Sequence, residues 1–191
     1  LYSIAPSKGN IKMLVIPISF AGSTASGHED EIVPWNDTRI SNLNSYYFGS
    51  QNSLAKYYDN ASFGVAKVTG MVSPIYENTN TSLSITNIMN DGYYSKLFSL
   101  IRNAVEWLYD TRTDVDWSEY DLNDNGCIDN IHLITDYHCT EWGAPLWPHM
   151  FSTGMKGTTD RPLPNVYSIS GTYFVNDAIT AIHEQGHIFD S

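Results

Sequence analysis

The fold begins with the stretch Ile11-Lys-Met-Leu-Val-Ile-Pro-Ile-Ser-Phe20. β-Branched and aliphatic side chains fill it almost without interruption, which is typical of a strand that is buried on both faces near the middle of a sheet. Pro17 has no backbone N–H to donate to a neighbouring strand, so we expect it to mark a bulge or the end of this strand.

Periodic patterns predict further elements downstream. Residues 52–61 read as a short amphipathic helix capped by Asn52 or Ser53, and residues 65–76 alternate like a strand. The strongest helical signal lies in residues 88–109, and we expect its apolar stripe to enter the core. That stripe consists of Leu97, Leu100, Ile101, Ala104, Val105 and Leu108.

The other segments predict one long connection, a strand and a last helix. Residues 22–45 are polar and rich in Asn and Ser, which is typical of a surface loop. Residues 128–135 read as a buried strand, and residues 176–190 as a helix capped by Asn176 or Asp177. The patterns alone therefore predict a domain that mixes α and β elements.

The composition describes one folded domain with a strong negative charge. Of the 191 residues, 42% are hydrophobic and only 16% are charged, which excludes a disordered chain and predicts a single domain over residues 1–191. The 10 Lys and Arg residues against 21 Asp and Glu give a net charge of -11, and the basic residues are scattered, so we expect no nucleic-acid partner. No apolar stretch approaches the roughly 20 residues that span a bilayer, so we expect no transmembrane segment.

The residues that carry chemistry lie in the last predicted helix, as His183-Glu184-Gln185-Gly186-His187. Side chains four apart on a helix point the same way, so both imidazoles can bind one zinc ion at about 2.0–2.1 Å. The glutamate between them is then the general base, which takes a proton from a water that the zinc activates. This H-E-x-x-H pattern predicts zinc-dependent hydrolysis of peptide bonds. The alternative is a surface helix with two exposed histidines and no metal.

Two stripes run along this helix. We expect the apolar stripe to pack on the core and the polar stripe to face a cleft. The apolar stripe consists of Ile179, Ile182, Gly186 and Phe189. The polar stripe consists of Thr180, His183, His187 and Asp190.

The chain resembles the secreted zinc metallopeptidases that are similar to immune inhibitor A, within the zincins. H-E-x-x-H is the last of several landmarks that occur in the order of that family and together span nearly all of the chain. The earlier landmarks are the opening strand, Ser53-Leu-Ala-Lys-Tyr-Tyr-Asp-Asn-Ala-Ser-Phe-Gly64, Val68-Thr-Gly70 before Tyr76, Val115-Asp-Trp-Ser-Glu-Tyr-Asp121, Asp124-Asn-Gly-Cys-Ile-Asp129 and Leu146-Trp-Pro-His149.

This resemblance implies an α+β fold, a zincin-like metallopeptidase domain in which a mixed β-sheet supports an active-site helix carrying H-E-x-x-H. It implies a secreted, extracellular endopeptidase that acts on a protein or peptide substrate and uses Zn²⁺. The edge strand of the sheet would pair with the extended substrate. Against the family, the C-terminal subdomain is absent from the 191 residues, so the peptidase domain is expected to be incomplete at its C-terminus.

The sequence departs from the family at the third zinc ligand. Family members resemble H-E-x-x-H-x-x-G-x-x-D, in which the final acidic residue binds the metal. Here Asp190 stands in place of the glycine and the chain stops at Ser191, so the third ligand is either missing or supplied from elsewhere. Asp190 is a candidate substitute, although it lies about 10 Å along the helix from His183. With two ligands alone we expect weak zinc binding and little proteolysis.

A second motif, residues 121–129, resembles the first part of a calcium-binding EF-hand loop. Oxygen ligands stand at positions one, three, five, seven and nine, and glycine at position six, as Asp121, Asn123, Asn125, the carbonyl of Cys127, Asp129 and Gly126. His132 stands at position twelve, where a bidentate glutamate is required, so at most a structural Ca²⁺ site is expected. An Asx-rich turn without a metal explains the same residues.

Three further residues carry weaker signals. Cys127 and Cys139 flank the strand predicted at residues 128–135, and their spacing allows a disulfide without demanding one. His149 follows Trp-Pro in a triplet similar to one in the family, which would place it at the cleft, whereas a packed or surface position is the plainer interpretation.

Two hypotheses of function follow from these residues. In the first, the chain is a secreted zinc endopeptidase in which His183 and His187 hold the metal and Glu184 is the general base. In the second, it is an extracellular binding or structural module that keeps the fold but lacks a finished metal site.

Overall fold

A computed structural model describes residues 8–23, 32–172 and 179–189. Its strands are β1 (Gly9–Ser19), β2 (Ala66–Val72), β3 (Tyr76–Glu77), β4 (Ile131–Thr135), β5 (His149–Ser152) and β6 (Val166–Gly171). Its helices are α1 (Asp37–Phe48), α2 (Leu54–Ala61), α3 (Ile85–Met89), α4 (Ser95–Thr111) and α5 (Ile179–Phe189). Short 3₁₀ turns occupy Ala21–Ser23, Thr81–Leu83 and Trp117–Tyr120.

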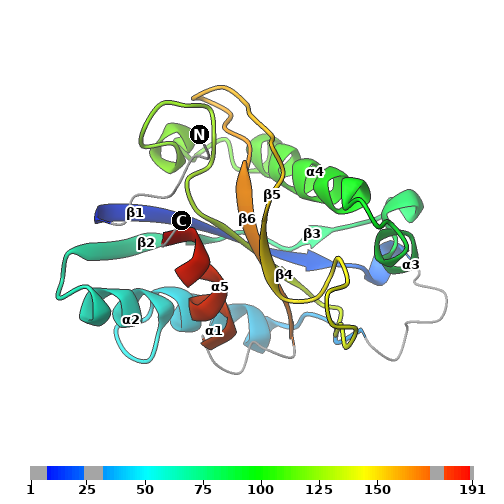
Figure 1. Cartoon of the computed structure of the whole chain (residues 1–191), viewed down its shortest axis with the longest axis horizontal. Helices are drawn as coiled ribbons and strands as arrows, with labels where there is room; N and C mark the ends of the chain where they lie inside the picture. The colour runs from blue at the N-terminus through cyan, green and yellow to red at the C-terminus, as the bar shows by residue number, and fades with distance from the viewer. Residues whose placement is uncertain (1–7, 24–31, 173–178, 190–191) are drawn as a thin grey trace.

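The strands of the described residues form one mixed sheet, which confirms the α+β class (Figure 1). The strand order is β2-β1-β4-β6-β5, and β3 pairs with the far end of β1 beyond β2. All pairs are parallel except β5 with β6, which are antiparallel. The antiparallel strand β5 therefore lies at one edge of the sheet.

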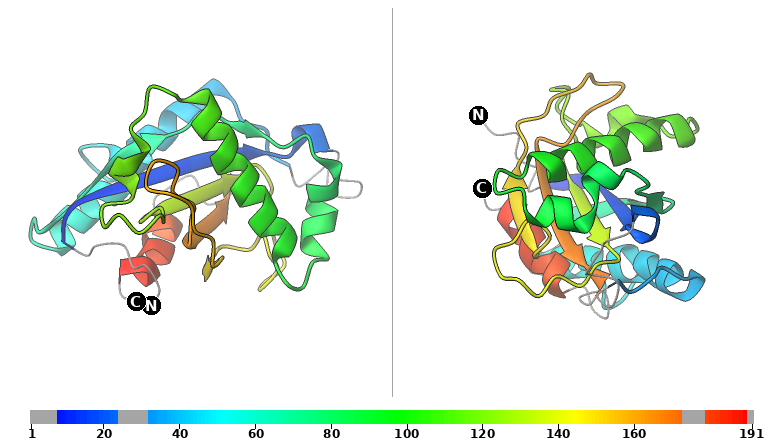
Figure 2. Two further views of the ribbon diagram at one scale, coloured as in Figure 1. Left: turned by 90° about the horizontal axis from the view of Figure 1, so that it is seen from above. Right: turned by 90° about the vertical axis from the view of Figure 1, so that its right-hand side faces the viewer.

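Helices cover both faces of the sheet (Figure 2). On one face, α1, α2 and α5 enclose the core around Ile11, Met13 and Val15 of β1. On the other face, α3 and α4 pack on Leu14, Ile16 and Ile18 of the same strand, together with residues of β4 and β6. Successive side chains of a strand point to opposite faces, so β1 supplies both cores.

The central strand tolerates its proline, contrary to the expectation of a bulge or an end. Pro17 pairs in register with Ile134 of β4, and β1 continues to Ser19. The backbone nitrogen of Pro17 points to the edge of β1 that carries β2 and β3. The carbonyls of Val15 and Ser19 point to the same edge and accept hydrogen bonds there. The pairing with β2 ends at Val15 and the pairing with β3 starts at Ile18, so the missing N–H falls in the gap between these strands.

The prediction of one surface connection over residues 22–45 is wrong in its second half. Residues 37–48 form α1, whose N-cap is Asn36, with the side chain accepting a hydrogen bond from the Arg39 backbone N–H. Only Leu43 and Tyr47 of this helix are fully buried, which explains why the apolar periodicity was too weak to identify it.

The apolar stripe predicted within residues 88–109 is confirmed. All six of its residues are fully buried in α4. The helix does not begin at residue 88, however, because α3 ends at Met89 and α4 starts at Ser95. Tyr94 before α4 has a φ of +59°, a left-handed conformation that separates the two helices.

No helix in the described part of the chain combines the length and apolar character needed to cross a membrane. The prediction that the chain has no transmembrane segment agrees with this finding.

The buried carboxylate of Asp136, directly after β4, predicts a pH-dependent stability. It accepts hydrogen bonds from the Ser19 hydroxyl at 2.9 Å and the Phe20 N–H at 3.0 Å, and burial raises its pKa from 3.8 to about 6. Between these values the folded chain holds a proton that the unfolded chain has lost, so the free energy of unfolding falls as the pH rises from about 4 to 6.

We expect Asp136→Asn to flatten this part of the pH dependence, because the amide keeps an acceptor for Phe20 but does not titrate. Urea midpoints between about pH 4 and pH 7 measure the slope. The exposed variant Asp160→Asn is the control and should keep the parent slope. Equal slopes in parent and Asp136→Asn would contradict the prediction.

Candidate functional site

The two histidines of the H-E-x-x-H motif converge on one side of α5. His183 and His187 are both exposed, and their Nε2 atoms lie 3.3 Å apart, with the ring planes at 89° to each other. A tetrahedral ion about 2.0–2.1 Å from two nitrogen ligands holds those nitrogens about 3.3–3.4 Å apart. The pair therefore has the separation that two ligands of one zinc ion require.

Glu184 lies between the histidines in sequence but is buried, with only 7% of its surface exposed. Burial raises the pKa of its carboxyl group, and the two neighbouring imidazoles act in the opposite direction. A carboxylate whose pKa is raised accepts a proton more readily. This environment suits the general base that the sequence predicts.

The third zinc ligand is not found among the described residues. Residues 8–23, 32–172 and 179–189 contain no group of three or more His, Cys, Asp or Glu side chains placed to hold a metal. The candidate substitute Asp190 lies outside the described residues. His183 and His187 are thus the two ligands that the described structure can offer.

The predicted core face of α5 is wrong, whereas His183 and His187 of the predicted polar face are exposed and line a cavity, as expected. Ile179, which we expected in the core, is 68% exposed, and Ile182 is only partly buried. The buried residues of the helix are Ala181, Glu184, Gln185 and Ile188. Burying an isoleucine side chain stabilises a fold by about 1.5–3 kcal/mol, so a competing interaction must favour the observed rotation.

That competing interaction is a buried hydrogen bond. The Gln185 amide Nε2 donates to Ser168 Oγ of β6 at 2.6 Å, and both side chains are fully buried. An apolar stripe therefore fails to predict the buried face of a helix when a polar side chain on another face has a buried hydrogen-bond partner. For Phe189, the last residue of the predicted stripe, the side chain lies outside the described residues.

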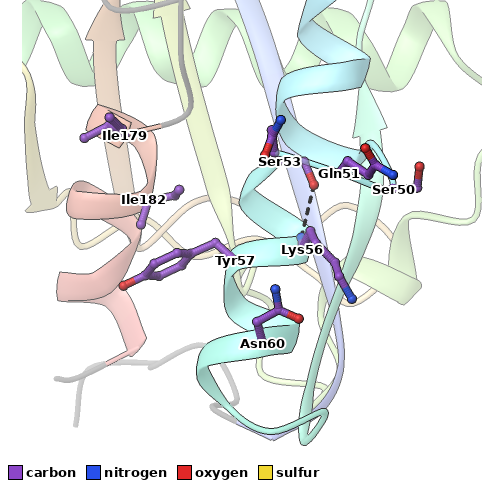
Figure 3. Close-up of a pocket in the computed structure, with 9 residues that line it drawn as sticks. Ser50, Gln51, Ser53, Lys56, Tyr57, Asn60, Ile179 and Ile182 are labelled. Atoms are coloured by element: carbon purple, nitrogen blue, oxygen red, sulfur yellow. Dashed lines mark hydrogen bonds between the residues drawn. The ribbon is translucent and has the colours of Figure 1, made fainter.

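A groove lies beside the histidine pair, between α2 and α5. One cavity of about 540 Å³ is lined by Tyr57, Tyr58, Ile179, Ile182, His183, Gly186 and His187. A neighbouring cavity of about 570 Å³ shares Tyr57, Ile179 and Ile182 with it and extends to the segment before α2. Figure 3 shows Tyr57 reaching from α2 toward Ile182, while Lys56 and Gln51 lie on the α2 side of that cavity. The two cavities are thus neighbours along the space between α2 and α5, and the first of them is lined by both histidines.

Sequence reasoning missed the α2 wall of this groove. Tyr58 donates a hydrogen bond from its hydroxyl to the Ile182 carbonyl at 2.7 Å, which joins α2 to α5 across 124 residues of sequence. The sequence predicts only a short amphipathic helix over residues 52–61. No local pattern pairs them with α5, because the contact depends on the tertiary arrangement.

His149 does not lie at this site, which contradicts its placement at the cleft. Its Nε2 contacts the Tyr167 hydroxyl at 2.9 Å, and its ring packs edge-on against Tyr94 before α4. Tyr167 precedes Ser168 in β6, and Ser168 faces α5, so Tyr167 and His149 lie on the α4 face of the sheet. The plainer interpretation, a packed histidine, is correct.

The motif at residues 121–129 forms a tight loop closed by backbone donors. The Asp121 carboxylate accepts from the backbone N–H groups of Asn125 at 2.9 Å and Gly126 at 2.6 Å. Asn125 Oδ1 accepts from the Cys127 N–H at 2.8 Å, and Asp129 Oδ2 from the Leu122 N–H at 2.8 Å. Loop oxygens therefore point inward as an Asx-rich turn requires, with or without a metal.

Two features of the loop bear on a cation. Asp129 Oδ1 is buried and has no hydrogen-bond partner among the described residues. Burial and the nearby Asp121 carboxylate raise the pKa of Asp129 to about 6.

The other positions of the motif agree with a calcium loop only in part. Gly126 has a φ of +78°, as expected for position six, whereas Asn123 is exposed. His132 at position twelve lies fully buried between serines of β6 and does not face the loop as a ligand.

The two cysteines are not bridged to each other, although their spacing allows a disulfide. Cys127 and Cys139 are both buried.

Neither the family models nor the curated proteins compared with this chain match it.

We expect the histidine pair to bind zinc as a unit. Replacing either residue, as His183→Ala or His187→Ala, removes one of the two nitrogens 3.3 Å apart, so the zinc affinity should fall at least about tenfold. Zinc titration by calorimetry measures the change. His149→Ala, which removes a histidine from the α4 face, is the matched control and should keep the parent affinity. Parent affinity in both α5 variants would exclude this pair as the ligands.

Proposed function

We propose that the chain is a zinc-dependent endopeptidase domain, similar to the secreted metallopeptidases of the immune inhibitor A type, that acts outside the cell. The observation that carries this proposal is one helix with two histidine Nε2 atoms 3.3 Å apart and a buried glutamate between them in sequence. The second hypothesis is a binding or structural module with an unfinished metal site, and a test of hydrolysis distinguishes it from the first.

The residues of the chain divide the proposed reaction between them. His183 and His187 would hold the zinc, which supplies Lewis acidity to the peptide carbonyl and the attacking water. Glu184 takes a proton from the attacking water and gives it to the leaving amine nitrogen, for which its raised pKa is suited. Water stays available because both imidazoles are exposed.

The sheet edge and the groove give the peptide substrate two places to bind. Among the described strands, β5 pairs only with β6, so its other edge keeps free backbone groups for an extended peptide. The groove between α2 and α5 is lined by His183 and His187 and offers space for side chains of the substrate. A substrate with an extended backbone is therefore favoured over a compact one.

Glu184→Gln tests the proposed function directly. The variant removes the proton acceptor but neither histidine, so in an active, full-length form of the protein hydrolysis of an unfolded protein substrate should fall at least about a hundredfold while the zinc affinity is kept. Glu141→Gln, at an exposed position, is the matched control and should keep the parent rate. Equal rates for Glu184→Gln and the parent would exclude Glu184 as the general base. Absence of hydrolysis in the zinc-loaded parent would favour the structural module.

We further propose that the loop at residues 121–129 binds Ca²⁺ as a structural ion. Support comes from the two buried carboxylates, Asp121 and Asp129, of which one oxygen lacks a hydrogen-bond partner among the described residues. Oxygen ligands of this kind are those that calcium prefers.

Calcium should then raise the melting temperature, because an ion that binds only the folded chain stabilises it by mass action. Asp121→Ala should abolish this shift. The control is Asp124→Asn, which removes an exposed charge at position four, where an EF-hand loop has no ligand, and should retain the shift. A parent melting temperature that is the same in calcium and in chelator would leave the Asx-rich turn as the explanation.

A further inference from the structure

A chain of buried polar groups runs from the sheet into α5. His132 of β4 contacts Ser168 through Nδ1 at 2.7 Å and Ser170 through Nε2 at 3.0 Å. Ser168 in turn accepts from Gln185 Nε2 at 2.6 Å. Three of these side chains are fully buried and Ser170 is almost so, in a part of the core that is otherwise apolar.

The imidazole at the centre of this chain is neutral. Burial lowers the pKa of His132 to about 3, so one ring nitrogen donates and the other accepts, and each has a serine hydroxyl as its partner. Gln185 Oε1 is buried and no described residue donates to it, so Ser168 is the only described partner of the amide. Breaking that bond would leave the whole amide buried without a partner.

This chain decides between two rotations of α5. A rotation that follows the apolar stripe would bury Ile179, yet in the observed rotation Ile179 is 68% exposed and Gln185 meets the sheet instead. The apolar contacts that α5 makes in this rotation come from the buried Ala181 and Ile188 and from Ile182, which is partly buried against the same core. Burial of Ile179 is given up, so hydrophobic burial alone does not account for the observed rotation. The Gln185–Ser168 bond is the buried polar contact that this rotation makes.

The same rotation sets up the candidate zinc site. Gln185 is two residues from both His183 and His187, about 200° round the helix, so anchoring Gln185 in the core turns both histidines outward. Glu184 is then held at the border of the core, where it is buried.

We propose that Gln185 is the positioning residue of this site: its hydrogen bond to Ser168, backed by His132, fixes the rotation of α5 that buries Glu184 and exposes the histidine pair. The structural part of this proposal needs no metal. Its catalytic part rests on the proposed peptidase function.

The test uses solvent exposure of the Ile179 methyl groups, because that exposure reports the rotation without zinc or substrate. Relaxation of isoleucine methyl signals by a soluble gadolinium chelate measures it, with the buried Ile134 as internal reference. In Gln185→Ala, which removes the amide and leaves only a small side chain on that face, the Ile179 enhancement should fall several-fold toward that of Ile134. Ser168→Ala, which leaves the Gln185 amide without its partner, should give the same result if Gln185→Ala folds poorly.

Ser170→Ala is the matched control. It removes the hydroxyl on the other nitrogen of His132 and leaves the Gln185–Ser168 bond, so it should keep the Ile179 enhancement even where it lowers the melting temperature. A purely structural role would lower stability in all three variants and leave Ile179 exposed in each. That outcome would overturn the proposal.

Kinetics separate the two parts. If the peptidase proposal holds, Gln185→Ala should lower kcat about tenfold to a hundredfold, with KM and zinc affinity near the parent values, because Glu184 moves while the histidines stay four residues apart. An unchanged kcat would overturn the catalytic part. Loss of Ile179 exposure in the variants, with no hydrolysis by any form of the chain, would support the positioning of α5 and contradict the peptidase function.

Discussion

The arrangement of the fold depends on β1, which is paired along both edges and covered on both faces. One edge carries β2 and β3, and the other carries β4. Its alternating side chains enter the core under α4 on one face and the core under α1, α2 and α5 on the other. The other elements are arranged around this strand: β4 lies beside β1, and β6 lies beside β4. Helix α5 lies on the face where Ile134 and Ala181 contact the odd-numbered residues of β1.

The register between β4 and β6 matters for the site because side chains alternate along a strand. His132 pairs with Ser168 in the ladder, and both face α5. A slip by one residue would turn His132 toward α4, into an apolar core, and would leave Ser168 and Gln185 without it. Buried polar groups are costly unless all of them are satisfied, so these three residues specify one register as well as one helix rotation.

How much the sequence could predict depends on whether a feature is local. The buried strand, the α4 stripe and the facing of His183 and His187 follow from periodicities within one element, and the structure agrees with each. Helix α1 was missed because few of its residues are apolar and buried. The core face of α5 was wrong because Gln185 finds its partner 17 residues away, on another element. Likewise, the groove against α2 depends on Tyr58, 124 residues from Ile182.

The site therefore combines two kinds of geometry with different dependence on the fold. The separation of the histidine nitrogens is set within two turns of α5, so it persists wherever the helix goes. Three other features change when α5 rotates or shifts on the sheet. They are the burial of Glu184, the distance from the histidines to the β5 edge, and the α2 wall of the groove. The proposed metal binding by the histidine pair would thus depend on the helix alone, whereas the proposed hydrolysis would also depend on how the helix docks on the sheet. Because the docking rests on a few buried hydrogen bonds, the two properties can be lost separately.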